Sequence, residues 1–376
     1  MKKVMIIALL ALCMALVFCS GKTRQEKPDV GCREACSACE EVSKAKGYDK
    51  ALACYTKAIR QAPNCAEAYN GRGARAYLPA GGYEQAIEDF DEAIRLKPDY
   101  AEAYSSRGSV YALTGGDYGQ AIADLDEAIR LKPDYAEAYS NRGAVYALNG
   151  DYDRAIADYT KAMQLNPPNQ AIIYYNRGNA YTGKNDFDRA AADYTEAIRL
   201  DPDNAGRIDP NNAGTLYLSR GNAYNIKKDY DRAISDYTEA IRLGLNSAAI
   251  YSNRGYAYEK KGEYGKAIAD YTEAIGLDSN FAPAYKNRGS LYEEKENYDK
   301  AIVDYNNAIR LAQDEAGVYY RRGYAYLCKK EYDKAIVDFE SALRIDPNLE
   351  EARKNLADAK KNLEDAKKQN KTGGKK

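Results

Sequence analysis

A unit of about 34 residues recurs along most of this chain, and its spacing limits the possible folds more than any other feature. The clearest copy runs from Ala136 to Asn169 and reads AEAYSNRGAVYALNGDYDRAIADYTKAMQLNPPN. Positions are numbered from Ala136, so that Tyr139 is position 4 and Gly143 is position 8. Small and aromatic residues recur three or four residues apart on two stretches, as they do along one face of an α-helix. Each unit therefore predicts two helices.

Small residues recur where the two helices of a unit would meet. Glycine occupies position 8 of eight units, as Gly73, Gly108, Gly143, Gly178, Gly221, Gly255, Gly289 and Gly323. Alanine occupies position 20, as Ala86, Ala121, Ala155, Ala190, Ala233, Ala267, Ala301 and Ala335. Tyr or Phe recurs around them at positions 4, 11, 17 and 24, which explains why the chain has 36 Tyr but no Trp. The tyrosines therefore indicate core packing rather than a cofactor site.

The turns complete the pattern of a helical hairpin. Asn149, Gly150 and Asp151 separate the two stretches, and Pro167 follows the second, which favours an antiparallel pair of helices. The combination of Y-x2-R-G-x2-Y, A-x3-Y/F and a final Pro resembles the tetratricopeptide repeat, with Tyr in place of the usual Trp. This resemblance implies an all-α fold, a right-handed α-solenoid of stacked hairpins.

About nine units and a closing helix are expected. The predicted units span residues 32–65, 66–100, 101–135, 136–169, 171–204, 214–247, 248–281, 282–315 and 316–349. A short segment written twice inserts residues 205–213, where Pro202 and Pro210 predict a surface loop. Residues 350–370 predict the polar capping helix that such arrays need, and 371–376 a disordered tail.

The N-terminus has the pattern of an export signal. Lys2 and Lys3 precede an apolar run from Val4 to Phe18, which is shorter than the about 20 residues of a membrane-spanning helix. Residues 1–21 therefore predict a signal peptide, and the polar stretch 22–31 predicts a tether or mature N-terminus.

Two ways of processing that signal remain open. Leu16-Val17-Phe18-Cys19 resembles a bacterial lipobox, in which the cysteine becomes the lipidated first residue, although Phe18 is bulkier than the residue usually found there. Cleavage near Gly21 is the alternative. Either route predicts an exported protein, which would be a periplasmic, outer-membrane or cell-surface lipoprotein tethered through Cys19, or a secreted protein.

Two charged positions are present in the same eight units. Position 7 is arginine, as Arg72, Arg107, Arg142, Arg177, Arg220, Arg254, Arg288 and Arg322. Position 23 is aspartate, as Asp89, Asp124, Asp158, Asp193, Asp236, Asp270, Asp304 and Asp338. The first unit lacks both and carries Ala38 and Cys54 there. Because the two charges occur together, we expect ion pairs that join the two helices, the alternative being a ladder for anionic ligands.

Five of the eight cysteines lie in the first unit. They are Cys32, Cys36, Cys39, Cys54 and Cys65. The C-x3-C-x2-C spacing at the start copies that of an iron–sulfur site, but the chain lacks the βα pattern of the enzymes that use it. In an oxidising compartment these residues predict one or two disulfides, with unpaired packing thiols and a metal or cluster as alternatives. No metal site and no cofactor are expected.

A second stripe of the first helix, at positions 2, 5, 9 and 12 with 6 and 13 beside it, faces away from the hairpin contact. In tetratricopeptide arrays this stripe lines the concave groove that holds partners. The candidate partner-binding residues are Asn141, Tyr175, Asn176, Asn179, Asn222, Asn253, Tyr256, Lys286, Asn287, Tyr320, Arg321 and Tyr324. Asn can hydrogen-bond a peptide backbone in both senses, and Tyr is an amphipathic anchor. The alternative is a face covered only by water.

Composition narrows the function. A net charge of −1 argues against a nucleic-acid partner, because phosphates demand a concentrated cationic surface. The absence of His removes the commonest general base, and the repeats leave no room for a catalytic domain, so no enzyme is expected. The sequence predicts a monomeric scaffold of the cell envelope that binds a protein or peptide. The alternative is a structural spacer or self-assembling array.

Overall fold

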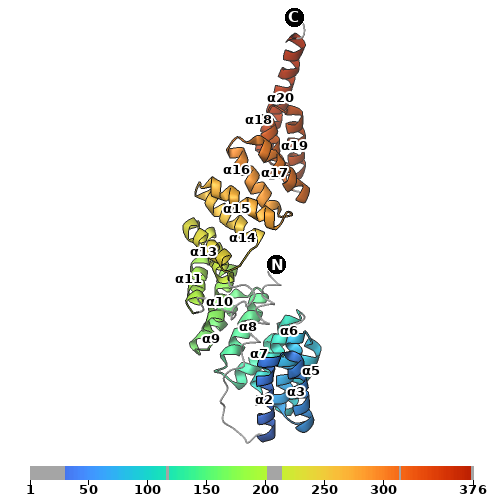
Figure 1. The fold of residues 1–376 in the computed structure, drawn as a ribbon, viewed down its shortest axis with the longest axis vertical. Helices are drawn as coiled ribbons and strands as arrows, with labels where there is room; N and C mark the ends of the chain where they lie inside the picture. The colour runs from blue at the N-terminus through green and yellow to red at the C-terminus, as the bar shows by residue number, and fades with distance from the viewer. Residues whose placement is uncertain (1–29, 116–117, 201–213, 313–314, 374–376) are drawn as a thin grey trace. The chain divides into compact units, whose positions relative to one another are not determined.

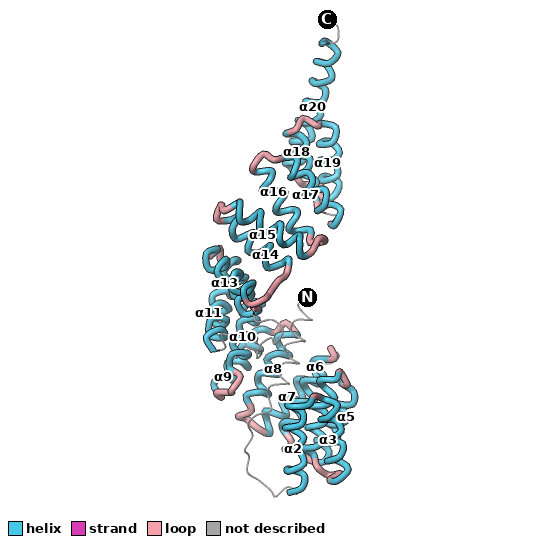
Figure 2. Tube along the Cα trace, in the orientation of Figure 1, coloured by secondary structure: helices cyan, strands magenta, loops and turns pink. Residues whose placement is uncertain are grey.

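The computed structural model covers most of the predicted array. It describes residues 30–115, 118–200, 214–312 and 315–373. The predicted signal peptide at 1–21 with Cys19, tether residues 22–29 and the inserted loop at 205–213 lie outside these ranges. Within them every regular element is a helix (Figure 2), so the all-α prediction is confirmed.

The chain divides into two compact units, Met1–Ala223 and Tyr224–Lys376. The helices wholly in the first unit are α2 (Val30–Lys46), α3 (Tyr48–Gln61), α4 (Ala66–Arg72), α5 (Tyr83–Leu96), α6 (Ala101–Leu113), α7 (Tyr118–Leu131), α8 (Ala136–Leu148), α9 (Tyr152–Gln164), α10 (Gln170–Gly183) and α11 (Phe187–Leu200). Helix α12 (Thr215–Ile226) contains the boundary.

The second unit repeats the same architecture. Its helices are α13 (Tyr230–Arg242), α14 (Ala248–Lys260), α15 (Tyr264–Leu277), α16 (Ala282–Glu294), α17 (Tyr298–Leu311), α18 (Ala316–Cys328), α19 (Tyr332–Ile345) and α20 (Glu350–Gly373). Within each unit, consecutive helices lie side by side, as α8 and α9 or α14 and α15 do (Figure 1). The second helix of one hairpin also packs on the first helix of the next, which is the packing of a solenoid.

The α8–α9 hairpin shows why the sequence folds in this way. Gly150 has a φ of 82°, a conformation that side chains disfavour, and it reverses the chain between the helices. The Asp151 carboxylate then accepts a hydrogen bond from the backbone N–H of Arg154 and caps α9. At the contact, a Cβ on Gly143 would lie 3.1 Å from the Tyr159 ring and 3.2 Å from the Ala155 carbonyl oxygen. Glycine at position 8 therefore lets the helices approach.

Position 24 supplies most of the large buried side chains. Tyr159, Tyr194, Tyr237, Tyr271 and Tyr305 are each at most 2% exposed. Around them lie the alanines of positions 20 and 27, which are also buried. The core of most hairpins is therefore one aromatic ring framed by methyl groups, and in the α6–α7 hairpin Leu125 takes the place of the ring.

Three boundaries depart from the regular pattern. The hairpin that begins with α4 has an extra residue, which a π-helix at Gly73–Tyr77 and a 3-10 turn at Leu78–Ala80 accommodate. Helix α2 begins at Val30, within the predicted tether. Helix α20 continues to Gly373, past the predicted start of the tail at 371. Among the described residues, no helix is long and apolar enough to cross a membrane.

Candidate functional site

Arginine at position 7 joins the two helices of its own hairpin. In the α8–α9 hairpin, Arg142 donates from Nε and Nη2 to the two carboxylate oxygens of Asp158, both at 2.8 Å. In seven of these pairs the arginine and the aspartate lie in the same compact unit as each other, and the Nη2–Oδ1 distances are 2.6–2.8 Å. Arg220 and Asp236, the eighth pair in the sequence, fall on opposite sides of the unit boundary. We name each pair an Arg–Asp clamp.

The remaining nitrogen of each clamp arginine binds the preceding hairpin. Nη1 of Arg177 donates to Thr160 at 3.0 Å, and Nη1 of Arg322 donates to Asn306 at 2.7 Å. Nη1 of Arg142 forms an ion pair with Asp126 in the same way. Each of these guanidinium groups is therefore occupied within the protein. This geometry favours the structural interpretation of the charges over the anionic-ligand ladder.

Burial sets the protonation behaviour of the clamps. Loss of water raises the pKa of Asp89, even though the hydrogen bond from Arg72 lowers it. The hydrogen bond to Asp124 raises the pKa of Arg107, so the cation is held. Desolvation of the carboxylate thus offsets part of the attraction between the two charges.

Three of the predicted partner-binding residues in the first unit are buried. Asn141, Tyr175 and Asn176 are 4%, 1% and 8% exposed, respectively. The Asn141 amide donates to the Ser105 hydroxyl at 3.3 Å, on the first helix of the preceding hairpin. These three side chains therefore do not offer a contact surface, because the neighbouring hairpins cover them. This corrects the prediction that they line an open groove.

The other two predicted partner-binding residues of the first unit lie on α10 and α12 and are only partly buried. Asn179 is half-buried, and its Oδ1 accepts a hydrogen bond of 2.7 Å from the Tyr194 hydroxyl. Asn222 is half-buried as well. Asn179 thus helps to satisfy the polar end of a core tyrosine.

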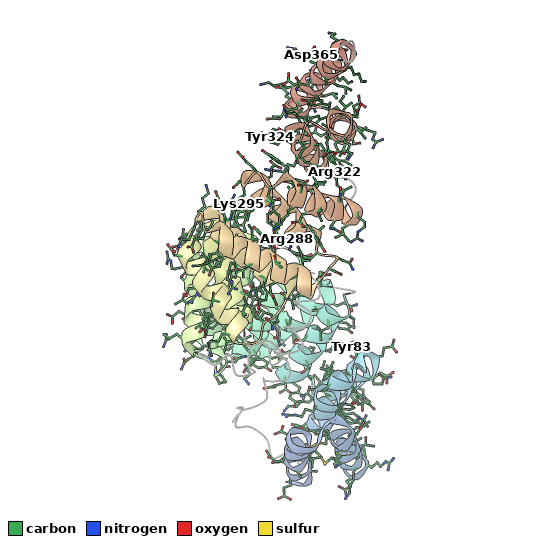
Figure 3. All side chains as sticks on the ribbon, turned by 45° about the horizontal axis from the view of Figure 1, so that its top comes forward. Tyr83, Arg288, Lys295, Arg322, Tyr324 and Asp365 are labelled. Carbon is green, nitrogen blue, oxygen red and sulfur yellow. A yellow bond between two sulfur atoms is a disulfide. The ribbon has the colours of Figure 1, made fainter. Side chains whose placement is uncertain are left out.

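The corresponding face of the second unit is more open. Tyr256 and Tyr324 are 36% and 38% exposed, and the side chains of Lys286 and Arg321 are 38% and 44% exposed. Asn253, Asn287 and Tyr320 are half-buried. Figure 3 draws these side chains and labels Tyr324. We name the residues at positions 5, 6, 9, 12 and 13 of α14, α16 and α18 the tyrosine face.

Two tyrosines of this face, Tyr256 and Tyr320, contact neighbouring side chains. Tyr230 packs edge-on against Tyr256 with ring centroids 6.5 Å apart, and Lys260 Nζ lies 4.9 Å from the Tyr256 centroid. Tyr320 accepts a hydrogen bond of 3.2 Å from Asn355 of the cap helix. These contacts favour one orientation of each ring.

Two glutamates of the tyrosine face were not predicted. The hydroxyl of Tyr271 donates to Glu259 at 3.0 Å, and that of Tyr305 donates to Glu293 at 2.6 Å. Arg321 lies 3.2 Å from the other oxygen of Glu293, whose pKa is raised by burial. The sequence carries a signal for this role. The next hairpin has Leu327 in place of the glutamate and Phe339 in place of the tyrosine, so the two residues change together.

The cysteines of the first hairpin occupy positions that carry other residues elsewhere. A disulfide joins Cys39 to Cys54 at positions 8 and 23, and a second joins Cys32 to Cys65. Cys36 is half-buried and unpaired, with its sulfur 3.7 Å from that of Cys65. Burial, with Glu67 and Glu40 nearby, raises the pKa of the Cys36 thiol to about 11.

Family comparisons agree with the observed register. The tetratricopeptide repeat model matches residues 136–169, 171–204, 248–281, 282–315 and 316–349. A second model, described as TPR repeat, matches residues 74–115, 113–150 and 221–262. The chain belongs to the tetratricopeptide repeat family. Tetratricopeptide proteins are generally non-catalytic scaffolds that bind protein or peptide partners, which indicates a protein-interaction scaffold here.

Solved structures share the fold. The C-terminal part of a TPR repeat-containing protein from Cytophaga hutchinsonii is 18% identical, with a TM-score of 0.56 over 66% of this chain and 98% of its own. A Pseudomonas aeruginosa pilF structure is 16% identical, with a TM-score of 0.52 over 60% of this chain and 97% of its own. At these identities the likeness supports the fold alone.

A third structure has a higher sequence identity and a lower TM-score. YrrB, described as a TPR protein with an unusual peptide-binding site, is 26% identical over 52% of this chain and 95% of its own, with a TM-score of 0.44. The comparison with curated proteins found no match.

Proposed function

We propose that this chain is an exported scaffold that holds a protein segment or peptide on the tyrosine face of its second unit. The observation that carries the proposal is the exposure of Tyr256 and Tyr324, 36% and 38%, whereas Asn141, Tyr175 and Asn176 on the counterpart helices α8 and α10 are at most 8% exposed. Exposed, ordered tyrosines are the side chains that contribute most to protein interfaces, because they bury a large ring at little entropic cost.

The surroundings of these rings suit an extended polypeptide. Asn253 and Asn287 carry amide groups that can both donate and accept, as a peptide backbone does. Lys286 forms an ion pair with Glu315, whose side chain is 42% exposed, so a charged partner group could replace that glutamate. The Arg321 side chain is 44% exposed and pairs with the more buried Glu293. The face therefore offers apolar anchors, backbone-directed amides and charges of both signs.

A pair of matched double variants tests this surface. Tyr256→Ala with Tyr324→Ala should lower capture of the partner by at least about tenfold, the effect expected when interface aromatics are truncated. Val303→Ala with Val337→Ala is the control, since these valines are 58% and 61% exposed on the second helices of the same unit. Envelope extract and a peptide library would be presented to the immobilised full chain. Loss of capture in the valine variant alone would place the site on the second helices.

Export rests on the N-terminal pattern of Lys2, Lys3 and the apolar run to Phe18. If Cys19 carries lipid, a labelled fatty acid should become attached to the wild-type protein and not to the Cys19→Ser variant. Both proteins should still be exported. Secretion of a chain that begins near Gly21, without lipid, would support the cleaved alternative. Retention of the full N-terminus in the cytoplasm would contradict export.

A structural spacer or self-assembling array is the second candidate function. Its end-to-end docking would have to use α20, whose exposed residues include Lys360, Lys361, Glu364 and Asp365. A charged terminal helix opposes such stacking, because the charges would lose their water. We therefore propose a monomer, and sedimentation at rising concentration tests it: a mass that increases with concentration would favour the array.

A further inference from the structure

Four metal-binding side chains gather where the first hairpin meets the second. Helix α2 places Cys32 and Cys36 one turn apart on the same face. Cys65 precedes α4, and Glu67 lies in its first turn. The sulfur atoms of Cys32, Cys36 and Cys65 all lie within 4.8 Å of one another. Two segments distant in sequence thus contribute two groups each to one cluster.

Two of the distances among these groups are those of a tetrahedral zinc site. With Zn–S bonds of about 2.3 Å and a Zn–O bond of about 2.0 Å, neighbouring ligand atoms lie roughly 3.5–3.8 Å apart. The Cys36 and Cys65 sulfurs are 3.7 Å apart, and the Cys32 sulfur is 3.7 Å from Glu67 Oε2. For one ion to be held by all four groups, the bond between Cys32 and Cys65 must open and the Glu67 carboxylate must move toward the other two sulfurs.

We propose that the first hairpin binds one Zn²⁺ through Cys32, Cys36, Cys65 and Glu67 when the Cys32–Cys65 disulfide is reduced. A dithiol reductant supplies two electrons and two protons to that disulfide and is itself oxidised to a disulfide. The three thiols then lose their protons to solvent as their sulfurs bind the metal. The fourth ligand is the carboxylate of Glu67.

The surroundings support this assignment. Cys32 and Cys65 are 4% and 5% exposed, so the cluster is largely shielded from water. Lys97 Nζ lies 3.5 Å from Glu67 Oε1, the oxygen that does not face Cys32, and can hold the carboxylate in place. The proposal gives a role to Cys36, the cysteine of the first hairpin that forms no disulfide.

The disulfide and the metal would exclude each other while performing the same task. Either one links the start of α2 to the start of α4 and so fastens the first hairpin to the second. The Cys39–Cys54 pair offers two ligands and has no comparable third group among the described residues. The proposal is independent of the tyrosine face, which lies in the other unit.

Reduced and oxidised full-length protein would be titrated with Co²⁺ and then Zn²⁺. The reduced chain should bind one equivalent of Co²⁺, with a thiolate-to-cobalt charge-transfer band and the visible spectrum of a tetrahedral ion, and Zn²⁺ should displace it. The oxidised chain should show neither signal. No saturable binding by the reduced chain would overturn the proposal.

Matched serine variants separate a built site from chelation by loose thiols. Cys36→Ser leaves both disulfides intact and should weaken Zn²⁺ binding by at least about 100-fold, with Glu67→Gln weakening it by about tenfold. Under the same reducing conditions, Cys39→Ser and Cys328→Ser should bind as the wild type does. Equal weakening by Cys36→Ser and Cys39→Ser would show chelation by an unfolded hairpin and would overturn the proposal. Far-ultraviolet circular dichroism would check that each variant remains helical.

Discussion

The first hairpin and its siblings join their two helices by different chemistry at equivalent places. In the hairpin of α2 and α3, a disulfide connects Cys39 at position 8 with Cys54 at position 23. In the hairpin of α8 and α9, Asp158 at position 23 is held instead by Arg142 from position 7. A covalent bond thus replaces an Arg–Asp clamp. The comparison shows that position 23 must be tied to the first helix, whereas the chemistry of the tie can change.

The exchange has a steric consequence. A side chain at position 8 occupies the space that glycine leaves for the position-24 ring in other hairpins. With Cys39 there, the Tyr55 ring lies so close to the next hairpin that a Cβ on Gly71 would be 2.4 Å from Tyr55 Cε1. Gly71 stands at position 6, where α8 and α10 carry Asn141 and Asn176. The substitution at position 8 is therefore compensated one hairpin further along the chain.

The largest effect should come from removing the covalent tie. Cys39→Ala with Cys54→Ala opens a link across a sequence separation of 15, and it should lower the free energy of opening the first hairpin by about 2–3 kcal/mol. Hydrogen exchange should accelerate in α2 and α3 and remain unchanged in α8 and α9, since repeats depend mainly on their neighbours. An equal loss of protection in all these helices would contradict a local tie.

Breaking an Arg–Asp clamp should cost slightly less. Arg142→Ala leaves Asp158 buried without its cation, and because the Arg142 side chain is 19% exposed we expect a loss of about 2 kcal/mol. Arg142→Met with Asp158→Leu removes both charges and should be closer to the wild type. Urea unfolding measures both. If the single variant is no less stable than the double variant, the clamp is a surface ion pair and the comparison with the disulfide fails.

Gly71→Ala tests whether the close approach of the two hairpins at this position requires glycine. Its Cβ would meet the Tyr55 ring, so we expect a loss of about 1–2 kcal/mol from overpacking. Combining it with Tyr55→Ala should remove the penalty of the glycine substitution, which a double-mutant cycle would detect. Additive effects would mean that the ring does not depend on this glycine.

The smallest effect is expected where a glycine has no such contact. Gly276 lies in α15 with nothing within 4 Å of an added Cβ, so Gly276→Ala should stabilise the second unit by about 0.5–1 kcal/mol through helix propensity. Thermal unfolding of the variant and the wild type measures this gain. Destabilisation by this change would show that helical glycines in the array are costly to replace regardless of their contacts.

The hairpin and its charged pairs could be predicted because they follow from local spacing. Neighbours three or four residues apart share a helix face, so the positions of Gly143 and Ala155 in the repeat are enough to define the contact between the helices. Arg142 and Asp158 could be paired because both disappear together in the first unit. These features depend on one hairpin alone.

The candidate partner-binding residues could be predicted only in part. Spacing placed Asn141, Tyr175 and Tyr256 on one face of their helices, but it did not tell which of them a neighbouring hairpin covers. That depends on side chains about a full repeat away, such as Ser105 for Asn141. Spacing likewise did not predict that Glu293 accepts the hydrogen bond of the Tyr305 hydroxyl, because this depends on how far the tyrosine ring extends across the hairpin.

The sequence by itself determined the helices, their pairing and the residues at their contact, because helical periodicity repeats the same local geometry in every unit. The tertiary structure alone decided which cysteines are joined, why Gly71 must be small and that Glu67 lies beside Cys32. The Cys39–Cys54 bond lies within the first hairpin, but the other contacts join that hairpin to the start of the next. Their distances follow from how hairpins stack and how side chains fill the space between them, which periodicity within one chain segment does not specify.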